Sequence, residues 1–181
     1  ELLEALLEGR PVAPELAWRA VRRGVLGLAL CPVLLGSAYK NKGVQPLLDA
    51  VVRYLPCPRD VENFALDPAE EGRQVPLSGD PADPAVCYAF KLEEGPFGQL
   101  TYIRLYQGRI ARGAILVNAR SGRKLRVSRL VRMHADKMEE IEAAEAGDIV
   151  ALFGVECASG DTLRAEGVDL VLASMHVPEP V

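Results

Sequence analysis

Apolar residues recur at helical spacing in the first third of the chain and at alternate positions in its second half. The helical spacing predicts three helices: one at the N-terminus, one from Pro14 to just before Gly24, and one over residues 44–54. Residues 31–35 form a short, continuous apolar run, which is typical of a strand buried on both faces. We therefore expect the first part to be the end of an α/β domain, since a single strand has no partner within it.

Residues 57–84 are rich in proline and acidic side chains, which is typical of a connector. Residues 61–66 could pair as an edge strand, and the rest is expected to be exposed loop. From residue 85 the apolar period becomes two, which predicts a run of short strands. Those expected are 87–92, 100–106, 114–117, 125–133, 149–155 and 162–163.

Glycines stand at the corners between these strands, at positions that include Gly108, Gly113 and Gly147. Short, evenly spaced strands with glycine corners predict an all-β closed barrel, because closure removes unpaired edges. The predicted organisation is an α/β fragment followed by that barrel. Its parts are an α/β part (1–56), a connector (57–84), a barrel (85–175) and a further linker (176–181).

The chain has 181 residues, 49% of them hydrophobic, and a net charge of −4, so intrinsic disorder is excluded as the main interpretation. No stretch approaches the roughly 20 apolar residues that a membrane helix needs. The chain starts with Glu1 inside a helical pattern, so we expect it to be a piece of a longer protein. The four cysteines are irregularly spaced, which predicts reduced thiols and no metal site; they are Cys31, Cys57, Cys87 and Cys157.

A polar loop follows the expected strand and precedes the third helix; residues 36–43 read Gly-Ser-Ala-Tyr-Lys-Asn-Lys-Gly. A loop that leaves the carboxyl end of a parallel strand is where α/β sheets bind ligands. Small residues there let a ligand approach the backbone N–H groups. On these grounds alone, an exposed polar loop without a ligand remains the alternative.

The run from Ser37 to Gln45 resembles the fifth nucleotide-binding motif and the following helix start of elongation factor G, a translational GTPase. The resemblance implies that backbone N–H groups of Ser37, Ala38 and Tyr39 recognise the guanine carbonyl oxygen of GTP. It also implies that the barrel is the second domain of a translation factor. Further segments that resemble elongation factor G lie at residues 89–91, 97–101, 104–108, 133–136, 147–149 and 160–163.

The chain contains no Gly-x-x-x-x-Gly-Lys-Ser/Thr run to cradle phosphates. Asn41 and Lys42 do not complete the Asn-Lys-x-Asp guanine motif, because Val44 stands where the Asp would be. We therefore expect that a longer parent protein binds and hydrolyses GTP to drive translocation on the ribosome. This chain alone is expected to bind no cofactor, to hold no catalytic residue and not to hydrolyse GTP.

Nine basic residues lie between positions 104 and 132 with no acidic residue among them, and the next segment is acidic. The two segments either pair with each other or leave a basic surface for phosphates. The resemblance implies a contact with small-subunit ribosomal RNA, and the cations expected there are at turns: Arg109, Arg112, Arg123 and Lys124. Arg129 and Arg132 are expected to be internal ion-pair partners.

Two other functions remain open from the sequence. One is a related translational GTPase, such as a release or ribosome-protection factor, and the other is a stand-alone β-barrel binding module. The expected partners are the ribosome and the remaining domains of the same protein, with no membrane. The expected compartment is the bacterial cytoplasm, with the mitochondrial matrix as the alternative.

Overall fold

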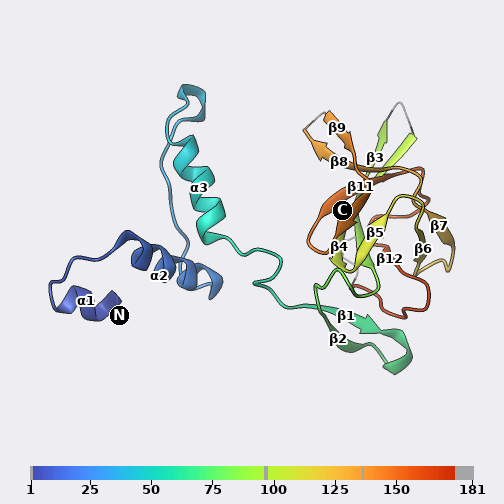
Figure 1. Cartoon of the computed structure of the whole chain (residues 1–181), viewed down its shortest axis with the longest axis horizontal. Helices are drawn as coiled ribbons and strands as arrows, with labels where there is room; N and C mark the ends of the chain where they lie inside the picture. The colour runs from blue at the N-terminus through green and yellow to red at the C-terminus, as the bar shows by residue number, and fades with distance from the viewer. Residues whose placement is uncertain (1, 96–97, 136, 174–181) are drawn as a thin grey trace, which may run out of the picture. The chain divides into compact units, whose positions relative to one another are not determined.

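The structure is a computed structural model that describes residues 2–95, 98–135 and 137–173. The chain divides into two compact units, Glu1–Val61 and Glu62–Val181 (Figure 1). The expected linker 176–181 lies outside the described residues, as do residues 96–97 of the first barrel hairpin.

The first unit consists of helices joined by loops. The helices are α1 (Leu2–Leu7), α2 (Pro14–Leu26), the single turn η1 (Ala38–Lys40) and α3 (Val44–Tyr54). The helix predicted over 44–54 is confirmed. The second helix begins at Pro14 as predicted but continues through Gly24 to Leu26, where the N–H of Gly27 donates to Arg23 O at 3.0 Å.

The strand expected at residues 31–35 is wrong: this segment has neither helical nor strand structure. A strand needs a neighbour for its N–H and C=O groups, and none of the described residues of the first unit supplies one. The unit consequently buries little apolar surface. Leu28, Val33 and Leu35 are 93%, 84% and 92% exposed, respectively.

The second unit begins with a hairpin of β1 (Asn63–Asp67) and β2 (Arg73–Leu77), which are joined through η2 (Pro68–Glu70). Part of the segment expected to be exposed loop is therefore a strand. β2 pairs with β1 along its length, and Leu77 of β2 packs against an apolar cluster that includes Ala65, Val86 and Tyr88. Leu66 also exchanges two backbone hydrogen bonds with Val171, at 2.7 and 2.9 Å.

An antiparallel sheet of eight strands, in the order β7-β6-β12-β3-β4-β11-β8-β9, forms the body of this unit (Figure 1). A separate two-stranded antiparallel sheet consists of β5 (Arg109–Ala111) and β10 (Ala143–Glu145). The strands of the large sheet are β3 (Val86–Gly95), β4 (Gly98–Gln107), β6 (Ile115–Asn118), β7 (Lys124–Arg126), β8 (Leu130–His134), β9 (Lys137–Glu140), β11 (Ile149–Phe153) and β12 (Thr162–Arg164).

The closed barrel expected from the sequence is wrong, because the terminal strands β7 and β9 do not pair with each other. The sheet curls into an open half-barrel instead. The single strand expected over 125–133 is split into β7 and β8, and the chain leaves the ladder at the intervening Val127. Val127 still donates to Ala114 O at 2.9 Å and stays buried.

The core lies inside the curl and follows the period of two that the sequence shows. Cys87 and Ala89 of β3 and Ile103 and Leu105 of β4 are fully buried there. The β5–β10 pair contributes Ile110 and Ala144 to the same core. Strands from both sides of the central β3–β4 hairpin contribute to this one cluster, so its packing holds the half-barrel together without edge closure.

Gly108 is expected to tolerate no side chain. It has φ +80°, and an added Cβ would lie 2.5 Å from Ala85 Cα and 2.6 Å from Asp83 O. Gly113 has a similar φ of +87° but no neighbour within 4 Å of such a Cβ. We expect Gly108→Ala to lower the unfolding free energy of the second unit by about 3 kcal/mol, and Gly113→Ala by about 1 kcal/mol. Urea unfolding followed by circular dichroism measures both; equal losses would contradict a steric role for Gly108.

Candidate functional site

The loop between residues 36 and 43 is closed by its own backbone. Ser37 N–H donates to Lys42 O at 2.9 Å, and Lys42 N–H donates back to Ser37 O at 3.0 Å. Glycine is required at both flanks: a Cβ on Gly36 would lie 2.8 Å from Lys42 O, and one on Gly43 would lie 2.8 Å from Leu35 O. The two ends of the loop therefore touch, and only glycine permits this distance.

The tip of the loop presents backbone donors to solvent. Ala38 and Tyr39 lie there, and Tyr39 is 96% exposed. Their N–H groups have no acceptor among the described residues, whereas Lys40 N–H donates to Ser37 O. The N-terminus of α3 follows directly, and the positive end of a helix dipole favours electron-rich groups nearby. The three residues predicted to face guanine therefore lie together on one ordered turn, but only Ala38 and Tyr39 have an unused N–H group, because Ser37 N–H donates to Lys42 O.

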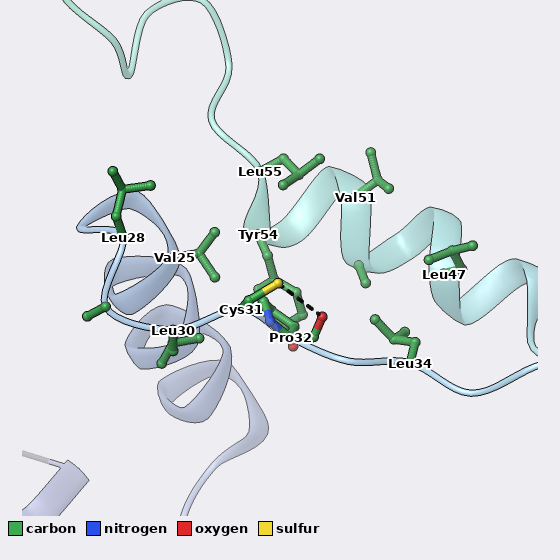
Figure 2. Close-up of a pocket in the computed structure, with 12 residues that line it drawn as sticks. Val25, Leu28, Leu30, Cys31, Pro32, Leu34, Leu47, Val51, Tyr54 and Leu55 are labelled. Atoms are coloured by element: carbon green, nitrogen blue, oxygen red, sulfur yellow. Dashed lines mark hydrogen bonds between the residues drawn. The ribbon is translucent and has the colours of Figure 1, made fainter.

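An apolar hollow of about 520 Å³ lies in the first unit beside this loop's two flanking segments. Figure 2 shows Leu47, Val51 and Tyr54 of α3 on one side and Cys31, Pro32 and Leu34 on the other. No carboxylate, amine or imidazole lines it, so it offers no acid–base chemistry. Its shape and composition are those of an incompletely covered packing surface.

Each of the four cations predicted to face RNA has an acidic neighbour. Arg109 Nε lies 3.4 Å from Glu145, Arg112 Nη1 lies 3.9 Å from Glu142, and Arg123 Nη1 lies 2.7 Å from Glu156. Lys124 pairs with Glu166. All four side chains are more than half exposed, so these ion pairs are weak and open to exchange.

Arg129 and Arg132 do form ion pairs as expected, with Glu140 at 2.6 Å and with Asp148 at 3.6 Å. Both pairs lie at the surface, however, since both arginine side chains are more than 40% exposed. The guanidinium of Arg129 also lies 4.6 Å from the ring centroid of Phe153. The basic and acidic segments of the sequence thus pair with each other over much of their length.

The structure reveals a buried polar cluster that the sequence analysis did not single out. Asp161 is 4% exposed, and Arg120 donates to its two oxygens at 2.6 and 3.0 Å. Asn118 Nδ2 and Ala158 N–H also donate to it, at 2.7 and 2.9 Å. The Arg120 bond and the other donors outweigh burial and lower the pKa of Asp161 to about 2. The cluster joins the β6–β7 turn to the loop before β12.

A polar hollow of about 380 Å³ lies over this cluster, lined by Arg120, Ser121, Arg123, Glu156 and Cys157 among others. Its charges balance, because Arg123 pairs with Glu156 and Arg120 with Asp161. Within the described part of the chain, no group of three or more His, Cys, Asp and Glu side chains is placed to hold a metal ion. No described helix is long and apolar enough to cross a membrane.

Comparison with known proteins gives a consistent result for both units. Residues 98–164 match the family model of elongation factor Tu domain 2. "Elongation factor G 1" of Syntrophus aciditrophicus is 60% identical over 99% of this chain and 26% of its own length. "Elongation factor G-1, mitochondrial" of Arabidopsis thaliana is 51% identical over 99% of this chain and 24% of its own length.

A solved structure also matches. A crystal structure of a protein from Thermus thermophilus superposes with a TM-score of 0.67 and 28% identity, over 98% of this chain and 25% of that one. The half-barrel, with its match to elongation factor Tu domain 2, defines the second unit as a domain of the translation-factor type. The chain belongs to the elongation factor G family. It spans about a quarter of the length of these relatives.

Asp161→Asn is expected to lower the unfolding free energy of the second unit by about 2 kcal/mol at pH 7, because the charged form gains its stability from Arg120 and the N–H donors. A folded-state pKa below the unfolded one gives stability above pH of about 4 that is lost as the pH falls toward 2. The difference in unfolding free energy between Asp161→Asn and the unsubstituted chain should therefore shrink to near zero at about pH 2. Unfolding titrations across this range measure it.

Glu156→Gln is the matched control, because Glu156 is 80% exposed beside the same hollow. Its effect should stay within about 0.5 kcal/mol at every pH. An Asp161→Asn variant as stable as the parent at pH 7 would contradict a stabilising role for the cluster.

Proposed function

We propose that the longer protein containing this chain is a ribosomal translocation factor that binds and hydrolyses GTP during protein synthesis. The similarity of the whole chain to elongation factor G supports this function over a release factor, a ribosome-protection factor or a stand-alone barrel. The observation that carries it is the ordered turn at residues 37–39. The N–H groups of Ala38 and Tyr39 there have no acceptor among the described residues and suit a guanine carbonyl oxygen, whereas Ser37 N–H closes the loop by donating to Lys42 O. Hydrolysis itself belongs to phosphate-binding residues outside this chain.

In this proposal the first unit is the end of the GTP-binding domain. The apolar residues left exposed on it, among them Val33, Leu35 and Val52, then pack against strands contributed by the rest of that domain. The segment 31–35 gains the strand neighbours that it lacks here. The remaining domains of the same protein are thus its first partner, with the boundaries proposed from the sequence at 1–56, 57–84 and 85–175.

The second proposed partner is the ribosome, met by the half-barrel through small-subunit RNA. Arg109, Arg112, Arg123 and Lys124 are exposed and held only by exposed carboxylates. A phosphate can displace such a carboxylate at small cost, because an exposed ion pair contributes about 1 kcal/mol or less. The proposed compartment is the bacterial cytoplasm, supported by bacterial relatives; the mitochondrial matrix is the alternative, supported by the plant relative.

The proposed guanine-binding loop, residues 36–43, is tested in the complete protein by adding a side chain at one of its two flanking glycines. Gly43→Ala places a Cβ against Leu35 O and should weaken binding of a fluorescent GDP analogue at least about tenfold, because the tip amides move. Gly72→Ala is the matched control, since Gly72 has a similar φ of +79° and nothing within 4 Å. Unchanged affinity in Gly43→Ala, or equal loss in the control, would contradict the assignment. The present chain alone should show no GTP binding at micromolar concentration.

The RNA-facing surface is tested by ribosome cosedimentation of this chain at several salt concentrations. Charge reversal of Arg109 and Arg112 together should weaken pelleting. It should also reduce the slope of the logarithm of the binding constant against the logarithm of the salt concentration by about two. Reversal of Arg10 and Arg73, which are also exposed and ion-paired, provides the control for net charge. Pelleting that does not depend on salt would contradict a phosphate-binding role.

A further inference from the structure

One arginine of α2 holds the end of α3 and the loop that follows it. Arg22 Nη1 donates to the carbonyl oxygens of Arg53 and Leu55, at 2.9 and 3.0 Å. Its Nη2 donates to Asp60 Oδ2 at 2.5 Å. We call Arg22, these two carbonyls and Asp60 the Arg22 clasp. Arg22 thus contacts both the last turn of α3, at Arg53, and the segment after the helix, at Leu55 and Asp60.

The loop closes on itself at the same point. Cys57 N–H donates to Asp60 Oδ2 at 2.7 Å, and Asp60 N–H donates to Cys57 O at 2.9 Å. The Cys57 N–H bond and the Arg22 charge lower the pKa of Asp60. One carboxylate oxygen thus joins the loop backbone to α2. The side chains of Asp60 and Arg22 are each only about 30% exposed, so this joint is partly shielded from water.

The geometry suits a guanidinium and no other side chain. The last carbonyls of a helix carry partial negative charge, and a cation there is favourable. The planar fork of arginine reaches the two carbonyls from Nη1 and the carboxylate from Nη2, whereas the three donors of lysine radiate from a single nitrogen and cannot reproduce this spacing. Trp18, one helical turn before Arg22, supports the arrangement because the guanidinium of Arg53 lies 4.2 Å from its ring centroid.

We propose that the Arg22 clasp is a latch that sets where the connection between the two units begins. α3 ends at Tyr54, but the clasp keeps the chain attached to the first unit as far as Asp60, next to the unit boundary at Val61. Release of the clasp frees residues 56–60, which can span up to about 17 Å when extended. The latch therefore controls the length of free chain between the units. Its contacts include neither the loop at 36–43 nor any of the four cations proposed to face RNA.

Trypsin tests the latch in the full chain, because Arg59 lies inside the clasped loop. A protease needs an opened segment, so cleavage after Arg59 reports the open population. Arg22→Ala should raise the rate of cleavage after Arg59 about tenfold, while cleavage after Arg73, in the second unit, keeps its rate. Arg23→Ala removes a neighbouring charge and a trypsin site from the same helix, and it should leave both rates unchanged.

An unchanged rate after Arg59 in Arg22→Ala, with α3 still helical, would overturn the proposal, as would equal acceleration in Arg23→Ala. If Arg22→Ala unfolds α3, Arg22→Lys decides, because lysine keeps a cation at the helix end but cannot span the clasp. In that variant the amides of Cys57 and Asp60 should exchange hydrogen about tenfold faster, while the Leu55 amide, which donates to Val51 O, keeps its rate. Parent-like exchange at Cys57 and Asp60 would also overturn it.

Discussion

Antiparallel pairing between β3 and β4 is the contact on which the second unit depends. The two strands run together from Val86 opposite Gln107 to the tip pair Gly95–Gly98. Every other strand of the large sheet pairs outward from them: β12, β6 and β7 on one side, β11, β8 and β9 on the other. The register is interrupted between Ala89 and Lys91, and Asp161 O and Gly160 N–H bond to Ala89 at this bulge. The loop that carries Asp161 is therefore positioned by the central hairpin.

The same constraint, that backbone polar groups need partners, explains why the first unit looks so different. Its helices satisfy their own N–H and C=O groups, so they form without a sheet. The apolar segment 31–35 cannot do so and stays irregular, with Leu35 almost fully exposed. The loop that follows is ordered, because Ser37 and Lys42 pair within it. Local bonds thus preserve the turn at residues 37–39 even where the surrounding packing is incomplete.

Sequence patterns predicted the elements whose bonds are local. The helix over 44–54 and the strands at β3 and β4 follow directly from apolar periods of 3.6 and two. Four strands were missed: β2, β5, β9 and β10. β2 lies in the proline-rich connector, β9 is exposed at every position, and β5 and β10 have only three residues each, too few to show a period of two. The prediction of one long strand over 125–133 in a closed barrel was also wrong. Val127 fits the alternating pattern, yet the chain leaves the strand pairing at this residue. No local signal distinguishes a buried strand residue from a buried residue just after a strand.

The candidate site shows the same division between local and distant contacts. The loop at Ser37, Ala38 and Tyr39 could be identified because its residues are consecutive in the sequence. Asp161 and Arg120, in contrast, are 41 positions apart and come into contact only in the folded protein. Arg22 lies where its charge would favour the dipole of its own helix, but it serves the end of α3 instead. The acidic partners of Arg109, Arg112 and Arg123 are likewise distant in sequence. Their presence means that a charge count along the chain overstates the positive field of the half-barrel, so any polyanion bound there must compete with carboxylates already in place.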